Sequence, residues 1–349
     1  MINFLVKKLA YGCLVMMGVV LIVFLLFQGF GDPSRLVLGQ RADATTQQNI
    51  RKELYLDQPK WKQLVLYVND LSFVSWYDSS TLRNRANYLS LIVTSKSSIV
   101  LKFPYLRRSY QSKREVGTVL AEALPGTFLL ALTAMFLACV IGIPLGVLAA
   151  RYKGTWVDSS AVFTGIIGIS APSFFIGIII AYLVGFLLFP YIGLPMNGSL
   201  HETDAFLGTH LQLKNLILPA ITLGIRPMAI ITQLTRSAML DVLQQDFIRT
   251  AIAKGLSAQK VIWKHALKNA LNPVITASTG WFAELLAGAF FVEYIFGWKG
   301  IGKVTVDALE KLDFPVVMGS VLVSALFFVL MNIVADLLNA WNDPRIRLG

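Results

Sequence analysis

Cysteine and histidine are scarce in this chain, since its 349 residues contain only two cysteines and three histidines. Cys13 and Cys139 both lie in long apolar stretches, so we expect neither a disulfide framework nor a cysteine metal site. His201 and His210, with the two acidic residues between them, lack the regular spacing of zinc ligands, and no zinc site is expected there. The sequence therefore predicts no metal and no other cofactor.

Charge is also scarce, because 15% of the residues are charged and 55% are hydrophobic, with a mean hydropathy of +0.63. These values exclude an ordinary soluble globular protein. Residues 9–30 carry no charge over 22 positions, enough to cross a hydrocarbon core of ~30 Å at ~1.5 Å per residue. Their length and the lack of a small-residue cleavage site argue against a removed signal peptide. The other expected spans are 119–150, 161–189, 215–238, 271–291 and 314–338. We therefore predict an all-α polytopic membrane protein with six transmembrane helices.

Lysine and arginine indicate the orientation of these helices. Twelve basic residues flank the spans on one side, namely Lys7, Lys8, Arg151, Lys153, the six from Arg236 to Lys268, Arg345 and Arg347. The opposite short loops hold only Lys214, Lys299, Lys303 and Lys311. Because short cytoplasmic loops are enriched in basic residues, both termini are expected in the cytoplasm. The net charge of +11 is partly this topology signal and is no evidence for nucleic-acid binding.

A long segment, 31–115, separates the N-terminal helix (1–30) from the remaining spans (116–349) and is expected outside the cytoplasm. It carries fourteen Lys and Arg residues, but long loops translocate largely regardless of charge. Residues 91–93 and 99–101 are predicted strands of a small cap. Two interpretations stay open: a basic solvated loop near lipid headgroups, and a surface that contacts a solute-binding protein.

The polar, basic segment 241–273 lies between the fourth and fifth expected spans and must leave the bilayer. Its first apolar residues recur at helical spacing, as Phe247, Ile248, Ala251 and Ile252 do. Gly255 can adopt the left-handed conformation that ends a helix, and Ser257 is expected to cap a second helix. Asn272-Pro273 is expected to end that second helix before the next span. A helix, a glycine hinge and a helix at a membrane face are typical of a docking element.

These residues resemble the cytoplasmic coupling loop of ABC-importer permeases for dipeptides, oligopeptides and nickel. Further similarity lies at 143–146, at the break 170–174, and at 297–302 and 343–347. Thr250, Phe247 and Ile252 depart from the acidic residue, tyrosine and arginine that are frequent at these positions. The resemblance implies that the ATPase-coupling residues are Phe247, Ala251, Ala253, Lys254, Gly255, His265, Asn269 and Pro273.

The resemblance also implies the partners: a second homologous permease, two cytoplasmic ATP-binding subunits and an extracytoplasmic solute-binding protein, in a bacterial inner membrane. In such a complex this chain has no catalytic residue, and the partner subunits hydrolyse ATP. Although residues 297–303 match G-x-x-x-x-G-K, Val304 replaces the hydroxyl residue that binds magnesium, so the chain is not expected to bind ATP. The implied substrate is a peptide.

Other functions stay open. Nickel is an alternative substrate of the same family, although the spans contain no cluster of histidine or methionine ligands. A membrane-embedded enzyme is a second alternative, against which the spans offer no catalytic motif. A structural subunit of another membrane complex, using the same docking element without moving substrate, is a third.

Two charged residues lie near the middle of expected spans, Arg226 in the fourth and Glu284 in the fifth. An unpaired charge at the bilayer centre costs at least ~2.5–3.5 kcal/mol, so both are expected to face the bundle interior and each other. Two interpretations remain: an ion pair that locks two helices together, and a polar patch on a translocation pathway.

Overall fold

The computed structural model describes residues 2–29, 51, 55–78, 88–93, 97–204 and 208–342. The chain forms two compact units. The larger unit comprises Met1–Gly12, Ala123–Lys303 and Ser324–Gly349, and the smaller comprises Cys13–Glu122 and Val304–Val323. Four helices contribute residues to both units, namely α1 (Ile2–Gly29), α6 (Val116–Arg151), α15 (Ile301–Glu310) and α16 (Phe314–Asn342). Arg345 and Arg347, two of the basic residues used to predict orientation, lie outside the described residues.

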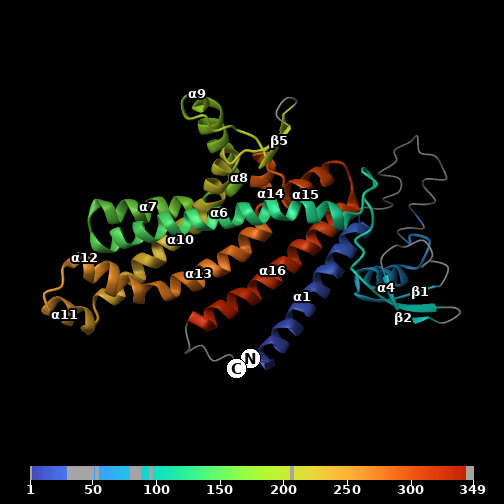
Figure 1. Cartoon of the computed structure of the whole chain (residues 1–349), viewed down its shortest axis with the longest axis horizontal. Coiled ribbons are helices and arrows are strands. Elements are labelled where there is room, and N and C mark those ends of the chain that lie inside the picture. Colours follow the sequence, from blue (N-terminus) through green and yellow to red (C-terminus); the bar gives the residue numbers. More distant parts are fainter. Residues whose placement is uncertain are drawn as a thin grey trace. The chain divides into compact units, whose positions relative to one another are not determined.

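The larger unit is built mainly of helices (Figure 1). Its other elements are α7 (Trp156–Ser170), α8 (Ser173–Ile180), the π-helical η2 (Ala181–Leu187), α9 (Phe189–Ile192), β4 (His201–Asp204), β5 (Gly208–Leu211), α10 (Lys214–Leu243), α11 (Asp246–Ala253), α12 (Ala258–Lys260), the π-helical η3 (Val261–Ala266), α13 (Leu267–Gly288) and α14 (Phe290–Ile295). Helix α10 packs against both α7 and α13. The antiparallel hairpin of β4 and β5 was not predicted from the sequence.

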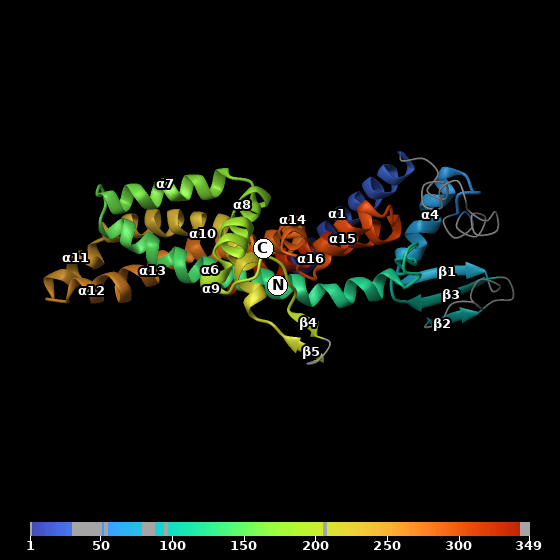
Figure 2. The ribbon, with the colours of Figure 1, turned by 90° about the horizontal axis from the view of Figure 1, so that it is seen from above.

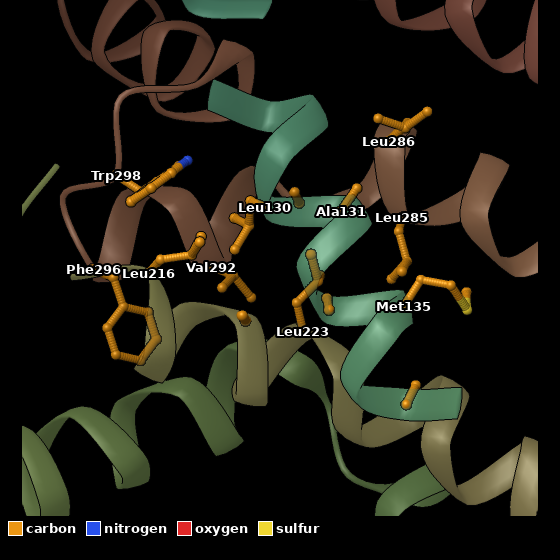
Figure 3. Close-up of a cluster of buried hydrophobic side chains, with 14 of the residues drawn as sticks. Leu130, Ala131, Met135, Leu216, Leu223, Leu285, Leu286, Val292, Phe296 and Trp298 are labelled. Carbon is orange, nitrogen blue, oxygen red and sulfur yellow. The ribbon is translucent and has the colours of Figure 1, made fainter. Parts of the chain in front are cut away.

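The core of the larger unit is apolar and lies where α6, α10 and α14 meet (Figure 3). Its buried side chains include Leu130, Leu216, Leu223, Val292, Phe296 and Trp298. The indole Nε1 of Trp298 donates a hydrogen bond to the carbonyl oxygen of Gly126 at 2.9 Å. Gly224 lets α10 approach α6 closely, since a Cβ there would stand 2.9 Å from the carbonyl oxygen of Ala134. Small residues at such crossings are typical of helices packed within membranes.

Four helices in the described part of the chain are long and apolar enough to cross a membrane: Val6–Gln28, Val116–Arg151, Lys214–Leu243 and Phe314–Ala340. Helix α7, together with α8 and η2, would make a fifth span, bent by 106° at the break that the sequence predicts near Pro172. The expected span 271–291 lies largely in α13, which is not among these helices. Its polar residues, Asn272, Thr276, Ser278 and Thr279, interrupt the apolar run. The structure thus supports a polytopic helical membrane protein but does not reproduce the count of six.

The smaller unit contains a three-stranded antiparallel sheet in the order β1-β3-β2 (Figure 2). Strands β2 (Tyr88–Val93) and β3 (Ser97–Lys102) confirm the two predicted strands, whereas β1 (Val74–Asp78) was missed. Helix α4 (Lys60–Leu71) precedes the sheet, and its buried Asp70 accepts a hydrogen bond from the Tyr77 hydroxyl at 2.9 Å. The part of the predicted cap at 31–50 lies outside the described residues.

Candidate functional site

The segment predicted to dock another protein forms a compact helical elbow, which we define as residues 244–266. Figures 1 and 2 show α11 and α12 beyond the ends of α10 and α13. One face of the elbow is buried against α6 and α10, through a cluster of Val147, Ala150, Met239, Val242, Ile248, Ala251, Val261, Ile262 and Ala266. Because this cluster is closely packed, a displacement of the elbow must be transmitted to the ends of both long helices.

Gly255 ends α11 in the predicted left-handed conformation, with φ +76°. Its amide donates to the carbonyl oxygen of Ile252 at 2.9 Å, and the next amide, of Leu256, donates to that of Ala251 at 3.3 Å. These two bonds form a Schellman motif, which satisfies helix-end carbonyls and reverses the chain direction. The half-buried Leu256 side chain packs on the same apolar cluster. The prediction that Gly255 ends a helix in a left-handed turn is therefore confirmed.

Two details of the prediction are wrong. Ser257 occupies the position before α12, but its side chain makes no capping hydrogen bond, and its carbonyl oxygen accepts from the Val261 amide instead. Pro273 does not interrupt the chain after η3, because α13 runs continuously from Leu267 through it. Proline removes one amide donor but keeps a helical φ, and here the helix continues without that bond.

The outer face of the elbow carries exposed apolar and basic side chains together. Phe247 and Trp263 are exposed, and Ile252 is 60% exposed. The basic residues around them, all exposed, are Arg249, Lys254, Lys260, Lys264 and Lys268. The sequence analysis did not select Trp263, although the basic residues Lys260 and Lys264 beside it indicated that this part of the helix is exposed. An exposed apolar patch rimmed by charge marks an interaction surface.

The other residues expected to couple to an ATPase are divided between the two faces of the elbow. Ala251 is buried and Ala253 is exposed, so one helix presents them in different directions. His265 is half-buried, and its carbonyl oxygen accepts a hydrogen bond from the Asn269 side-chain amide at 2.8 Å. Pro273 is exposed on α13. Only part of the predicted set is therefore exposed, and Ala251 packs in the apolar cluster instead.

Arg226 and Glu284 lie across the contact between α10 and α13. Nη1 of Arg226 is 3.9 Å from Oε1 of Glu284, and the guanidinium lies over the ring of Trp281 at 5.2 Å. The two side chains are 52% and 54% exposed, so neither is enclosed by this chain. On α13, exposed residues recur every four positions from Asn272 through Thr276 and Gly280 to Glu284. This line of exposed residues, which we call the polar stripe, occupies one face of α13.

Comparisons with known proteins identify the family. The family described as "Binding-protein-dependent transport system inner membrane component" matches residues 142–348, and the family of its N-terminal domain matches residues 1–131. The chain belongs to this family. The resemblance drawn from the sequence is thereby confirmed, and the chain is an inner membrane component of a transport system.

Curated relatives of this inner membrane component cover nearly its full length. The probable D,D-dipeptide transport system permease protein DdpB of Escherichia coli K12 is 36% identical, over 96% of this chain and 95% of that protein. The dipeptide transport system permease protein DppB of Alkalihalophilus pseudofirmus is 33% identical, over 99% of this chain and 100% of that protein. A chain of the inward-facing MetNI methionine ABC transporter shares the fold, with a TM-score of 0.51 and 17% identity over 65% of this chain and 97% of that one.

The inner membrane component holds a buried acid that sequence reasoning did not select. Glu293 on α14 follows the predicted fifth span, and its Oε2 accepts the amides of Gly302 at 2.7 Å and Lys303 at 3.2 Å. A Cβ at Gly300 would stand 2.3 Å from this carboxyl group, so only glycine fits there. Burial raises the pKa of the Glu293 carboxyl to about 7, against the opposing effect of these amides. The glycine-rich loop that resembles a phosphate-binding motif is thus occupied by the chain's own carboxyl group.

Two ion pairs of the inner membrane component were also missed. Asp158 at the start of α7 binds Arg236 on α10, with Arg236 Nη2 2.9 Å from Asp158 Oδ2 and the Nε of Arg236 on the other oxygen. Lys8 on α1 lies 2.6 Å from Asp336 on α16. In both cases the sequence places an acidic residue in or beside an apolar helix. Such a residue needs a cationic partner, so an ion pair could have been predicted there.

Proposed function

We propose that this inner membrane component is a permease subunit of an ATP-driven ABC importer and forms the translocation pathway for di- or oligopeptides. The names of its two relatives, both dipeptide transport system permease proteins, support a peptide substrate. The proposed topology has six membrane spans, with α13 as the fifth, and both termini in the cytoplasm. A second homologous permease, two ATP-binding subunits and an extracytoplasmic solute-binding protein complete the complex.

The observation that carries this proposal is the two-faced elbow. Its inner face is packed on α6 and α10, and its outer face leaves Phe247, Ile252 and Trp263 exposed among basic residues. A partner that covers the outer face can therefore push on the ends of two long helices. Closure of the ATP-binding subunits would supply that push, and the packed inner face would convert it into alternate opening of the pathway.

Changing Ile252 to aspartate tests the docking surface. The side chain is largely exposed, so the permease should fold, but a charge at the centre of the apolar patch should weaken binding of the ATP-binding subunits by at least about thirtyfold, as loss of a typical hot spot does. The measurement is the amount of ATPase that co-purifies from membranes in mild detergent. Ile252→Leu keeps the apolar surface, so the ATPase should still co-purify with this variant. Undiminished recovery with I252D would place the ATPase elsewhere.

The pathway is proposed to run along the polar stripe of α13 and the side chain of Arg226. Half-exposed charges facing lipid would be costly, whereas a water-filled pathway between two permeases would solvate them. The stripe also offers a peptide the hydroxyl of Thr276 and the exposed backbone at Gly280. This arrangement favours a pathway lining over a contact with lipid.

Arg226→Ala, Glu284→Ala and the double variant separate pairing from transport. Each single change leaves one half-exposed charge unpaired and should lower stability by about 1 kcal/mol, whereas the double change should restore most of it. Thermal unfolding of the purified complex measures this coupling, and peptide uptake into proteoliposomes measures function. A double variant that is stable yet takes up little peptide supports the pathway role. If it transports normally, the pair only locks α10 to α13.

Peptide-stimulated ATP hydrolysis in the reconstituted complex tests the function as a whole. A dipeptide presented with the binding protein should stimulate hydrolysis and enter the vesicles, whereas nickel salts should do neither. Stimulation by nickel alone would reassign the substrate within the family. Hydrolysis that responds to no solute would favour a structural subunit over a transporter.

A further inference from the structure

The smaller unit contains a half-open cavity of about 240 Å³ between α1, α4, the chain around Arg107 and α16. Its walls are mainly apolar, with Phe24, Phe27 and Phe314 among them, and the Phe27 and Phe314 rings meet edge to face with centroids 5.2 Å apart. Cationic and amide groups of Arg107, Lys60 and Gln28 also line it. A cavity with apolar walls and a few convergent polar groups is the usual form of a ligand site.

Arg107 is the unusual member of this lining. The residue is only 7% exposed, and its Nε is buried without a hydrogen-bond partner. Its guanidinium lies over the rings of Tyr67 and Tyr55, at 5.0 and 5.8 Å from their centroids. Within the described part of the chain, no carboxylate oxygen comes within the 4.0 Å of an ion pair with it. A buried arginine without an anion is costly, so the cavity favours an anionic occupant.

The two buried acids in the described part of this unit are already bonded to other groups. The Asp70 carboxylate accepts hydrogen bonds from the hydroxyls of Tyr77 and Tyr55, at 2.9 and 3.2 Å. The Asp313 carboxylate accepts from the Tyr110 amide at 3.0 Å and from the Ser109 hydroxyl. Neither acid directly neutralises the guanidinium. Among the described residues, no acid therefore neutralises Arg107, and its positive charge is available to a ligand.

The place of the cavity along the chain sets its depth in the membrane. One candidate span ends at Gln28, whose Nε2 is buried without a partner, and another begins at Phe314. Both residues line the cavity. Span ends lie at the level of the lipid headgroups, whichever side of the membrane they face. An anion at this depth, beside phenylalanine rings that can contact acyl chains, has the chemistry of a phospholipid.

We infer that this cavity binds the phosphate group of an anionic phospholipid, with Arg107 as the main ligand and Lys60 and Gln28 as further donors. The planar guanidinium suits a phosphodiester, and basic pockets at the ends of membrane helices accept such headgroups. The bound lipid would contact α1, α4 and α16 at once and stabilise their packing in the smaller unit. This inference depends on the membrane location of the chain and not on the nature of its cargo.

The test uses the full complex in nanodiscs of phosphatidylcholine, with or without phosphatidylglycerol. Native mass spectrometry counts retained phosphatidylglycerol, and thermal unfolding reports protection. Arg107→Gln should weaken retention about tenfold, the effect of one charge-assisted hydrogen bond. Arg108→Gln is the matched control, because Arg108 is the next residue and its exposed side chain lies 3.7 Å from Glu115. Equal loss in both variants would indicate general charge attraction and overturn the site.

A second variant keeps the test valid if Arg107→Gln does not fold. Lys60 is exposed at the first turn of α4, so Lys60→Gln should fold and still retain several-fold less phosphatidylglycerol. Unchanged retention in K60Q, or in a folded R107Q, would overturn the inference. Inorganic phosphate at millimolar concentration should not replace the lipid. If phosphate protects the protein as well as phosphatidylglycerol does, the ligand is a free anion and the lipid assignment is wrong.

Discussion

Gly255→Val should separate ATP hydrolysis from peptide uptake, lowering uptake about tenfold while hydrolysis by the partner subunits continues. No atom lies within 4 Å of a Cβ placed at this position, so the only penalty is the left-handed backbone at φ +76°. For a non-glycine residue that conformation costs ~1–2 kcal/mol, and more for a β-branched one. Relief of the strain would break the Schellman motif and loosen α11 from η3. The elbow would then yield to the ATPase without moving α6 and α10.

The control for this experiment lies in the same chain. Gly154 has almost the same backbone, with φ +77°, and an equally open surrounding, but it joins α6 to α7 outside the elbow. Gly154→Val therefore carries the same strain and should leave uptake per ATP nearly unchanged. Gly255→Asn should keep most coupling, because asparagine tolerates the left-handed region. Uptake that remains normal in G255V, measured with ATP hydrolysis in the same proteoliposomes, would remove the hinge from the mechanism.

Asp158→Ala should be the most destabilising of these changes, at about 3 kcal/mol. The Asp158 side chain is 8% exposed and that of Arg236 is 26% exposed, so removing the acid leaves a largely buried guanidinium without a partner. The same carboxylate also accepts the Gly154 amide at 2.9 Å, which fixes the turn between α6 and α7. Thermal unfolding of the purified complex, with and without the substitution, measures the loss.

Two further variants show whether loss of the Asp158–Arg236 ion pair causes the loss of stability in Asp158→Ala. Asp158→Leu combined with Arg236→Met replaces both charges with apolar groups and should recover much of the lost stability, as for other buried pairs. Asp246→Ala breaks the exposed pair with Arg249, 3.6 Å apart, and should cost under ~1 kcal/mol. Equal losses for Asp158→Ala and Asp246→Ala would contradict a special role for the α7–α10 pair.

Prediction from the sequence succeeded where a feature depends on neighbouring residues. The break between α7 and α8 follows from Pro172, and the turn at Gly255 follows from the freedom of glycine at positive φ. It failed at Pro273. The helix α13 continues through this proline, because the loss of one backbone hydrogen bond costs less than the other interactions of α13 contribute. The count of six spans stays a prediction, since α13, the expected fifth span, carries a polar stripe and is not apolar enough to be recognised by composition.

The sequence alone determined the membrane class, the helical elbow and its hinge, and the family, because charge-free runs, helical periodicity and short motifs are properties of adjacent residues. Tertiary structure decided which elbow residues face inward: Ile248 is buried and Ile252 is exposed, although both are apolar and lie four positions apart. It also decided the partner of Asp158, which lies 78 positions away, and left the Nε of Arg107 buried without a hydrogen-bond partner. Burial and pairing depend on what distant segments bring to the same place, and no local pattern contains that information.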